Sequence, residues 1–250
     1  MSVCCKAALF LLVPVLTWVP AAGQGCSLPR RIAHPQTIQL PSGSRVEFHT
    51  FRSRSLKKDL GYSVFLPASY DSNGTNYPVV YFLHGMNNDH TSWCAGRYGN
   101  LPEIVDQTIR EQHLPEFVML HPSGEEGYYT DAADGTALYE RAFQEDFISA
   151  MESKYRIRSD PKGRAIGGTS MGGYGALKLA FKHSHFYSAV AAGSPIVLVG
   201  DDPAQLLGGE DSRRSQLFSH LLHRVYGNPV DERHWQANRL ENLVSGNLNG

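Results

Sequence analysis

Apolar and polar residues alternate along two early stretches, 45–51 and 60–66, and this period of two predicts two strands that form a hairpin at the edge of the sheet. The next apolar stretch, 78–83, is nearly continuous, which is typical of a central strand that is buried on both faces. A helix is predicted over 101–112 and another strand over 116–120. The repeated order of strand, helix and strand indicates an α/β protein.

Apolar residues recur every four positions from 137 to 155 and predict an amphipathic helix with one buried stripe: Phe143, Phe147, Met151 and Tyr155. The remaining predicted elements alternate between strand and helix and end in two helices: 163–166, 174–182, 186–192, 215–225 and 231–243. The sequence therefore predicts one domain over 24–250, with a mostly parallel central sheet and helices on both faces.

A Gly-x-Ser-x-Gly pattern lies where a predicted strand gives way to the next predicted helix. This arrangement is typical of a nucleophile elbow, in which a tight turn aims a serine hydroxyl outward. A Cβ atom at Gly168 or Gly172 would collide with the neighbouring strand or helix, which explains glycine at both positions. We predict that Ser170 is a nucleophile, and a buried structural turn is the alternative interpretation.

The buried strand at 78–83 runs directly into His84, Gly85 and Met86, and hydrolases of this architecture place an oxyanion donor at such a point. We predict that the backbone N–H groups of Met86 and Met171 bind the oxygen that becomes negative when a carbonyl is attacked. His84 is interpreted as structural, because it lies at the strand exit rather than at the position of a proton relay.

The composition suits one globular domain with a substantial core, because 42% of the 250 residues are hydrophobic and 19% are charged. The formal net charge is only -1. A chain so close to neutral has no excess of positive charge for a polyanion, so no nucleic-acid partner is predicted.

The first 23 residues differ from the rest of the chain. Lys6 provides a minimal positive start, 7–19 is an apolar run, and 21–23 offers the small residues that a signal peptidase reads. A cleaved secretory signal is therefore predicted, with a secreted or periplasmic mature protein. A membrane anchor is the alternative, but a span needs about 20 apolar residues, so no stable membrane insertion is expected.

Cleavage after Gly23 would remove Cys4 and Cys5 and would leave Cys26 and Cys94. An exported protein can oxidise two such cysteines, so a disulfide between them is one interpretation. Two unpaired thiols are the other. Lipidation of Cys26 is disfavoured, because the residues before it lack the aliphatic side chain that such a signal normally carries.

The elbow and its surroundings resemble the "putative esterase" family of α/β-hydrolases, which includes esterase D (S-formylglutathione hydrolase), feruloyl esterases and the antigen 85 mycolyltransferases. The resemblance covers 46–243 and is most specific in the Ser-Met-Gly-Gly-Tyr-Gly-Ala string that begins at Ser170. Other similar stretches are 81–85, 139–157 and 191–195. The resemblance implies an α/β-hydrolase fold and Ser-His-Asp chemistry without metal or organic cofactor, with Ser170 as nucleophile and Met86 and Met171 as oxyanion donors.

In this fold the acid and the histidine of the triad follow the serine in chain order. The segment 245–250 is interpreted as the loop before the strand that delivers the acid. The acid and the base are therefore expected beyond Gly250, in a chain that is C-terminally truncated. Alternatives within the chain are Asp201, Asp202, Asp231, His220, His223 and His234. Each has an ordinary interpretation, and Asp231 in particular is placed to cap a helix.

The leading hypothesis is a serine carboxylic-ester hydrolase that forms an acyl-enzyme on Ser170 and acts on a small-molecule or glycan-linked ester. One alternative is an acyltransferase of the mycolyltransferase type, in which an alcohol instead of water resolves the acyl-enzyme. Another is a non-catalytic relative that binds a ligand. A base within hydrogen-bond reach of Ser170 distinguishes an enzyme from a binding protein. The acyl group and the oligomeric state stay open at this point.

Overall fold

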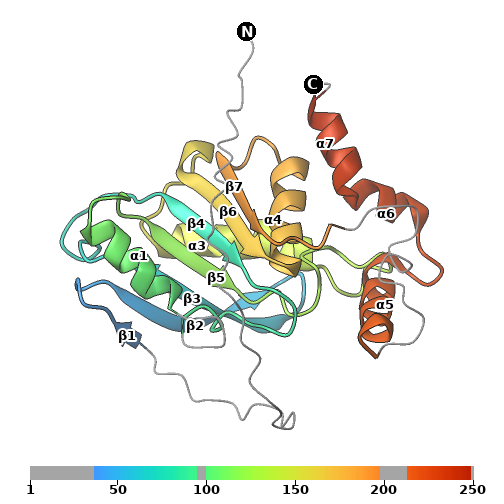
Figure 1. Cartoon of the computed structure of the whole chain (residues 1–250), viewed down its shortest axis with the longest axis horizontal. Coiled ribbons are helices and arrows are strands. Elements are labelled where there is room, and N and C mark those ends of the chain that lie inside the picture. Colours follow the sequence, from blue (N-terminus) through green and yellow to red (C-terminus); the bar gives the residue numbers. More distant parts are fainter. Residues whose placement is uncertain (1–36, 95–99, 198–212, 249–250) are drawn as a thin grey trace, which may run out of the picture. The chain divides into compact units, whose positions relative to one another are not determined.

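The strands assemble into a mixed sheet, seen here in a computed structural model that describes residues 37–94, 100–197 and 213–248. Within these residues seven strands follow the order β1-β2-β3-β5-β4-β6-β7 (Figure 1). Their bounds are β1 Thr37–Gln39, β2 Arg45–Ser53, β3 Lys58–Leu66, β4 Val79–Leu83, β5 Val118–Pro122, β6 Arg164–Thr169 and β7 Ala189–Gly193. The first three strands are antiparallel, and β5, β4, β6 and β7 run parallel as predicted. β2 and β3 form the predicted hairpin, but its position at the edge of the sheet is wrong, because β1 pairs with the outer side of β2.

Helices connect the parallel strands and follow the last of them. Their bounds are α1 Leu101–Arg110, α2 Tyr139–Arg141, the π-helical η1 Ala142–Phe147, α3 Ile148–Lys154, the short 3₁₀ segment η2 Pro161–Gly163, α4 Met171–Lys182, α5 Arg213–Tyr226, α6 Glu232–Asn238 and α7 Leu240–Leu248. Because α4 lies between β6 and β7 in the chain, it begins at the carboxyl-terminal edge of the parallel strands.

Side chains that alternate along the strands enter two different cores, one on each face of the sheet. The core beside α1 contains Leu40, Val46, Phe65, Val105 and Met119. The larger core on the other face includes Val64, Tyr81, Leu120, Phe147 and Leu179. Phe65 belongs to the first core and its neighbour Val64 to the second, as the pleat of a strand requires. The prediction of helices on both faces is confirmed.

The predicted helix over 137–155 is present, but its middle is π-helical. Phe143, Phe147 and Met151 are buried, and the rings of Phe143 and Phe147 stack with their centroids 6.0 Å apart. Both rings also pack edge-on against Tyr81 of the central strand. The spacing of four predicted the buried stripe correctly, but the same spacing also fits an α-helix, so the π-helical turn was not foreseen.

Several boundaries differ from the predictions, and tertiary contacts explain two of the differences. β6 extends to Thr169 because Gly167 and Gly168 pair with β4. The helix predicted over 231–243 is divided at Arg239, whose backbone is extended. The Tyr174 hydroxyl donates a hydrogen bond to the carbonyl of Asn238, immediately before this break, at 3.0 Å. β5 and β7 each begin two or three residues later than predicted.

The expected leader at 1–23 and Cys26 lie outside the described residues. None of the helices in the described ranges is long and apolar enough to cross a membrane. The predictions of export and of a disulfide therefore stay predictions.

Candidate active site

Ser170 occupies a tight turn between β6 and α4. Its backbone angles are φ 57° and ψ -118°, a conformation that residues other than glycine rarely adopt. Its N–H group donates to the Gly193 carbonyl at 2.9 Å, and its own carbonyl accepts from the N–H of Tyr174 at 3.0 Å. The neighbouring strand and the helix therefore hold the strained residue from both sides, and its side chain remains half-buried.

Two glycines allow this turn to form, as predicted. A Cβ atom at Gly168 would lie 2.4 Å from the carbonyl oxygen of Gly172, and one at Gly172 would lie 2.2 Å from the carbonyl oxygen of Leu83. Both contacts are with backbone atoms, which cannot move aside as a flexible side chain could. The start of α4 is thus packed directly against the end of β4.

The loop after β4 reaches the same edge of the sheet as the turn. Leu83, the last residue of β4, pairs in register with Gly168. A Cβ atom at Gly85 would lie 3.4 Å from the Cβ atom of Ser170. A side chain at this position would therefore contact the serine, so glycine leaves the space beside Ser170 free.

Both amides predicted to bind an oxyanion belong to segments that adjoin Ser170. Met171 is the first residue of α4, where the N–H groups have no partner within the helix. Met86 follows Gly85 and is partly buried against the larger core. A helix N-terminus also favours negative charge through its aligned peptide dipoles.

His84 is buried and makes two hydrogen bonds through its ring. Nε2 accepts from the N–H of Gly124 at 2.8 Å, and Nδ1 lies 2.8 Å from the carbonyl oxygen of Gly85. Burial lowers the pKa of His84, so the ring is neutral at pH 7. Both ring nitrogens are occupied by backbone groups, which agrees with a structural role rather than a proton relay. Sequence reasoning missed Gly124, because the parallel pairing of β4 and β5 brings it to His84.

Tyr128 and Tyr129 follow β5 at the same edge, and both have a positive φ of 52°. Both side chains are fully buried, so the loop is packed against the protein at these two positions instead of being solvated. The ring of Tyr129 fills the space beside Gly124 and Gly175, where added Cβ atoms would lie 2.3 Å and 2.6 Å from it. The loop is thereby packed against α4, the helix that follows the serine.

A polar cavity of about 680 Å³ lies between this loop and the end of α5. Its lining includes both acidic and basic side chains: Glu125, Glu126, Asp134, His223 and Arg224. Neither Ser170 nor the two predicted oxyanion donors line it.

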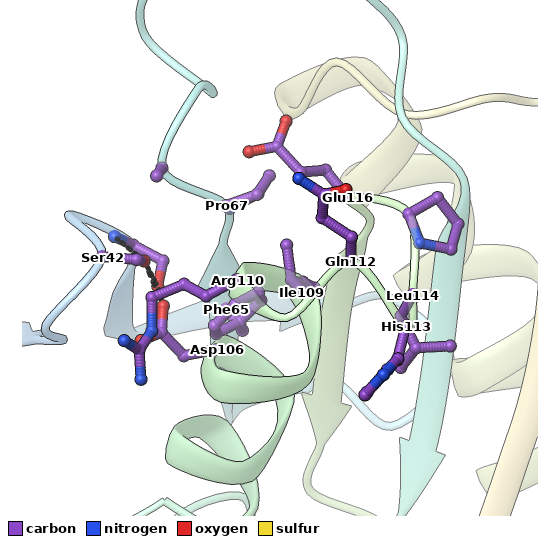
Figure 2. A pocket seen from close by; sticks show the side chains of 13 residues that line it. Ser42, Phe65, Pro67, Asp106, Ile109, Arg110, Gln112, His113, Leu114 and Glu116 are labelled. Atoms are coloured by element: carbon purple, nitrogen blue, oxygen red, sulfur yellow. Dashed lines mark hydrogen bonds and ion pairs between the residues drawn. The ribbon is translucent and has the colours of Figure 1, made fainter.

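A second cavity, of about 640 Å³, lies beside α1, near the amino end of β5 (Figure 2). It is lined by the segment just before β5 and by α1, where Asp106 accepts hydrogen bonds from Ser42 and Ser44. The amino ends of the parallel strands meet there, whereas Ser170 lies at their carboxyl ends. This cavity is therefore separate from the candidate active site.

Of the late candidates for an acid or a base, Asp231 and His234 make structural contacts, whereas His220 is exposed and His223 lines the polar cavity. Asp231 caps α6 by accepting from the backbone N–H of His234 at 2.9 Å, as predicted. The ring of His234 packs against Tyr226, with 5.8 Å between the centroids. Asp201 and Asp202 lie outside the described residues.

No hydrogen bond joins the Ser170 hydroxyl to another residue within 37–94, 100–197 and 213–248. The expectation that the acid and the base lie beyond Gly250 stays a prediction. Across the same ranges, no group of three or more His, Cys, Asp or Glu side chains is arranged to hold a metal ion.

Cys94 is partly buried, and its sulfur lies 3.3 Å from the hydroxyl oxygen of Ser63. Burial raises the pKa of this thiol to about 11. A thiol that stays protonated at pH 7 is a poor nucleophile. Cys94 is therefore not a second candidate nucleophile.

A family model described as "Putative esterase" matches residues 53–241 of the chain. An esterase from Mycobacterium tuberculosis is 30% identical over 161 residues, which cover 63% of this chain and 34% of that protein. An acetyl esterase from Caldicellulosiruptor saccharolyticus is 27% identical over 187 residues, covering 71% of this chain and 65% of that protein. The chain thus spans about a third of the length of the mycobacterial relative.

Solved esterase structures share the fold. A ferulic acid esterase superposes with a TM-score of 0.62 at 28% identity, covering 77% of this chain and 70% of that chain. An S-formylglutathione hydrolase from Agrobacterium tumefaciens superposes with a TM-score of 0.61 at 19% identity, covering 82% and 72%. These likenesses and the mixed sheet confirm the predicted α/β-hydrolase fold.

Proposed function

The chain belongs to the "putative esterase" family, and on that premise we propose that it hydrolyses carboxylic esters through an acyl-enzyme on Ser170. The observation that carries the proposal is the strained backbone of Ser170, at φ 57°, on a strand-to-helix turn that Gly85 approaches from β4. Strain of this kind persists where the surrounding structure enforces it, and it is common at catalytic residues.

In the proposed reaction the Ser170 oxygen attacks the ester carbonyl carbon while a general base removes the hydroxyl proton. The carbonyl oxygen becomes negative and accepts hydrogen bonds from the N–H groups of Met86 and Met171. The bond to the alcohol then breaks, and the alcohol leaves with the proton. Water attacks the acyl-enzyme, releases the carboxylic acid and restores the serine.

The general base and its acid partner are proposed to come from outside the described residues. Support comes from the Ser170 hydroxyl, which has no hydrogen-bond partner within the described ranges. Asp231 is not proposed as the acid, because its carboxylate is engaged in capping α6, and the ring of His234 packs against Tyr226.

The proposed substrate is a small-molecule or glycan-linked ester. Relatives are described as an acetyl esterase and as an endo-1,4-beta-xylanase/feruloyl esterase, and these descriptions support esters of small acids carried by carbohydrate. We further propose that such a substrate lies outside the cytoplasm, and the predicted leader at 1–23 supports this. N-terminal sequencing of protein from the native host should therefore begin at or near Gln24, and an intact Met1 on soluble protein would contradict export.

The proposal is tested with a fluorophosphonate probe, which bonds covalently to activated serines. The full-length protein should be labelled, and Ser170→Ala should abolish the labelling. Ser123→Ala is a matched control at the same edge of the sheet and should leave the labelling unchanged. Labelling of Ser170→Ala at the wild-type level would show that another residue reacts.

A further inference from the structure

Three successive carbonyl groups in the loop after β4 are held by side chains. The hydroxyl of Tyr129 donates to the His84 carbonyl at 3.2 Å, and the Asn88 amide donates to the Met86 carbonyl at 3.1 Å. Between them, Nδ1 of His84 lies 2.8 Å from the Gly85 carbonyl. A segment that contains glycine is intrinsically free to rotate, and these bonds remove that freedom.

The Nε2 atom of His84 determines which group is the donor in the hydrogen bond between Nδ1 and the Gly85 carbonyl. Nε2 of His84 receives the N–H of Gly124 at 2.8 Å, and a nitrogen that accepts a hydrogen bond carries no proton. Since burial lowers the pKa of the ring, His84 has one proton, and it must reside on Nδ1. Nδ1 therefore donates to the Gly85 carbonyl.

Holding the Gly85 carbonyl also fixes the next N–H group. A trans peptide is planar, and its C=O and N–H bonds point in opposite directions. The N–H that shares a peptide with the Gly85 carbonyl is that of Met86, the proposed oxyanion donor. We propose that His84 is a positioning residue, which aims the Met86 amide at the reacting carbonyl by holding the opposite end of the same peptide.

Gly124 and Tyr129 complete the arrangement, which rests on the proposed function of Ser170. Gly124 sets which nitrogen of His84 has the proton, and Tyr129 holds the peptide before Gly85. Both belong to the loop that follows β5. The pairing of β4 with β5 therefore also determines the direction in which the Met86 N–H group points. The neutral ring never touches the substrate in this arrangement.

Two substitutions of His84 distinguish its effect on the orientation of the Met86 amide from its contribution to packing. The Asn side chain can place a donor near the position of Nδ1, whereas Gln places its polar group near that of Nε2. In the full-length protein, His84→Gln should lower kcat for p-nitrophenyl acetate by about 100-fold, because this is the loss expected when one oxyanion donor is removed. KM should change by less than about threefold. His84→Asn should retain kcat within about tenfold. Equal losses in both variants, or full activity of His84→Gln, would overturn the proposal.

A second measurement does not depend on turnover or on folding of the variants. Nitrogen-15 NMR of the wild-type histidine rings should show His84 as the neutral Nδ1–H tautomer at pH 7. An Nε2–H tautomer or a protonated ring would contradict the proposal. Failure of the wild-type protein to react with a fluorophosphonate would count against the proposed function instead, and the tautomer in the same sample would still decide whether His84 holds the peptide.

Discussion

One methyl group at Gly172 would meet the backbone of β4, because its carbon would lie 2.2 Å from the Leu83 carbonyl oxygen and 2.7 Å from that of His84. Atoms of a central strand cannot shift without loss of sheet pairing. We expect Gly172→Ala to lower the free energy of unfolding by about 3 kcal/mol, the upper end of the usual cost of overpacking. Urea unfolding measures this change.

The control for this substitution is Gly74→Ala, because a Cβ atom at Gly74 meets nothing within 4 Å. Exposed substitutions of this kind usually change the free energy of unfolding by less than about 0.5 kcal/mol. Equal effects at Gly74 and Gly172 would contradict the close approach of α4 to β4.

At the scale of elements, α4 is anchored by a buried charged cluster that faces α2. Lys178 is fully buried, and its ammonium group donates to the Glu140 carboxylate at 2.6 Å. Lys182 and His183 contact the same carboxylate at 3.0 and 3.1 Å. Burial lowers the pKa of Lys178 to about 8, although Glu140 opposes this shift. Burial alone would raise the pKa of Glu140, but Lys178, His183 and Lys182 outweigh it and lower that pKa.

Loss of the shared carboxylate should destabilise this anchor strongly. Glu140→Gln leaves the Lys178 cation buried without its partner, and breaking such a pair costs about 3 to 5 kcal/mol of unfolding free energy. Lys178→Met is the comparison, and it should cost less, since Glu140 keeps Lys182 and His183. Urea unfolding at pH 7 ranks the two variants, and a greater loss in Lys178→Met would contradict this account of the cluster.

The same cluster gives a pH dependence with a defined sign. Because the pKa of Glu140 is lower in the folded protein than its ordinary 4.5, the folded state is stabilised above pH 4.5. This contribution is lost as the pH falls below that value and the carboxylate is protonated. The stability difference between wild type and Glu140→Gln should therefore shrink between pH 5 and about pH 3 in urea titrations. A difference that stays constant over this range would count against an ionised Glu140.

At the scale of the whole molecule, the two edges of the described sheet differ. β1 is short and polar at one edge, whereas β7 at the other has no charged residue and exposes Val190 at 38%. An uncharged and exposed edge strand is a template for pairing with another chain. Val190→Lys should therefore reduce concentration-dependent association of the 250-residue chain in light scattering. Ile104→Lys, at an exposed position on α1, is the control and should leave association unchanged.

The sequence by itself determined most of the strands and helices of this protein and the position of its candidate nucleophile. Alternation predicted the hairpin of β2 and β3, and the spacing of Phe143 and Phe147 predicted a buried helical stripe. The glycines around Ser170 predicted a strand-to-helix turn. Each of these features depends on residues within one or two turns of the chain, where local sterics and the burial of one face suffice to fix the conformation.

Tertiary structure alone decided which distant groups meet. Gly124 reaches His84, and Glu140 reaches Lys178, only because parallel strands and their helices bring segments about 40 residues apart side by side. The break at Arg239 likewise depends on packing against α4. The local sequence does not show which backbone amide will bind His84, since almost every residue supplies an N–H group. It does not show which carboxylate will be shared by buried cations either, since most charged residues are solvated. The proton position on His84 is therefore a property of the fold.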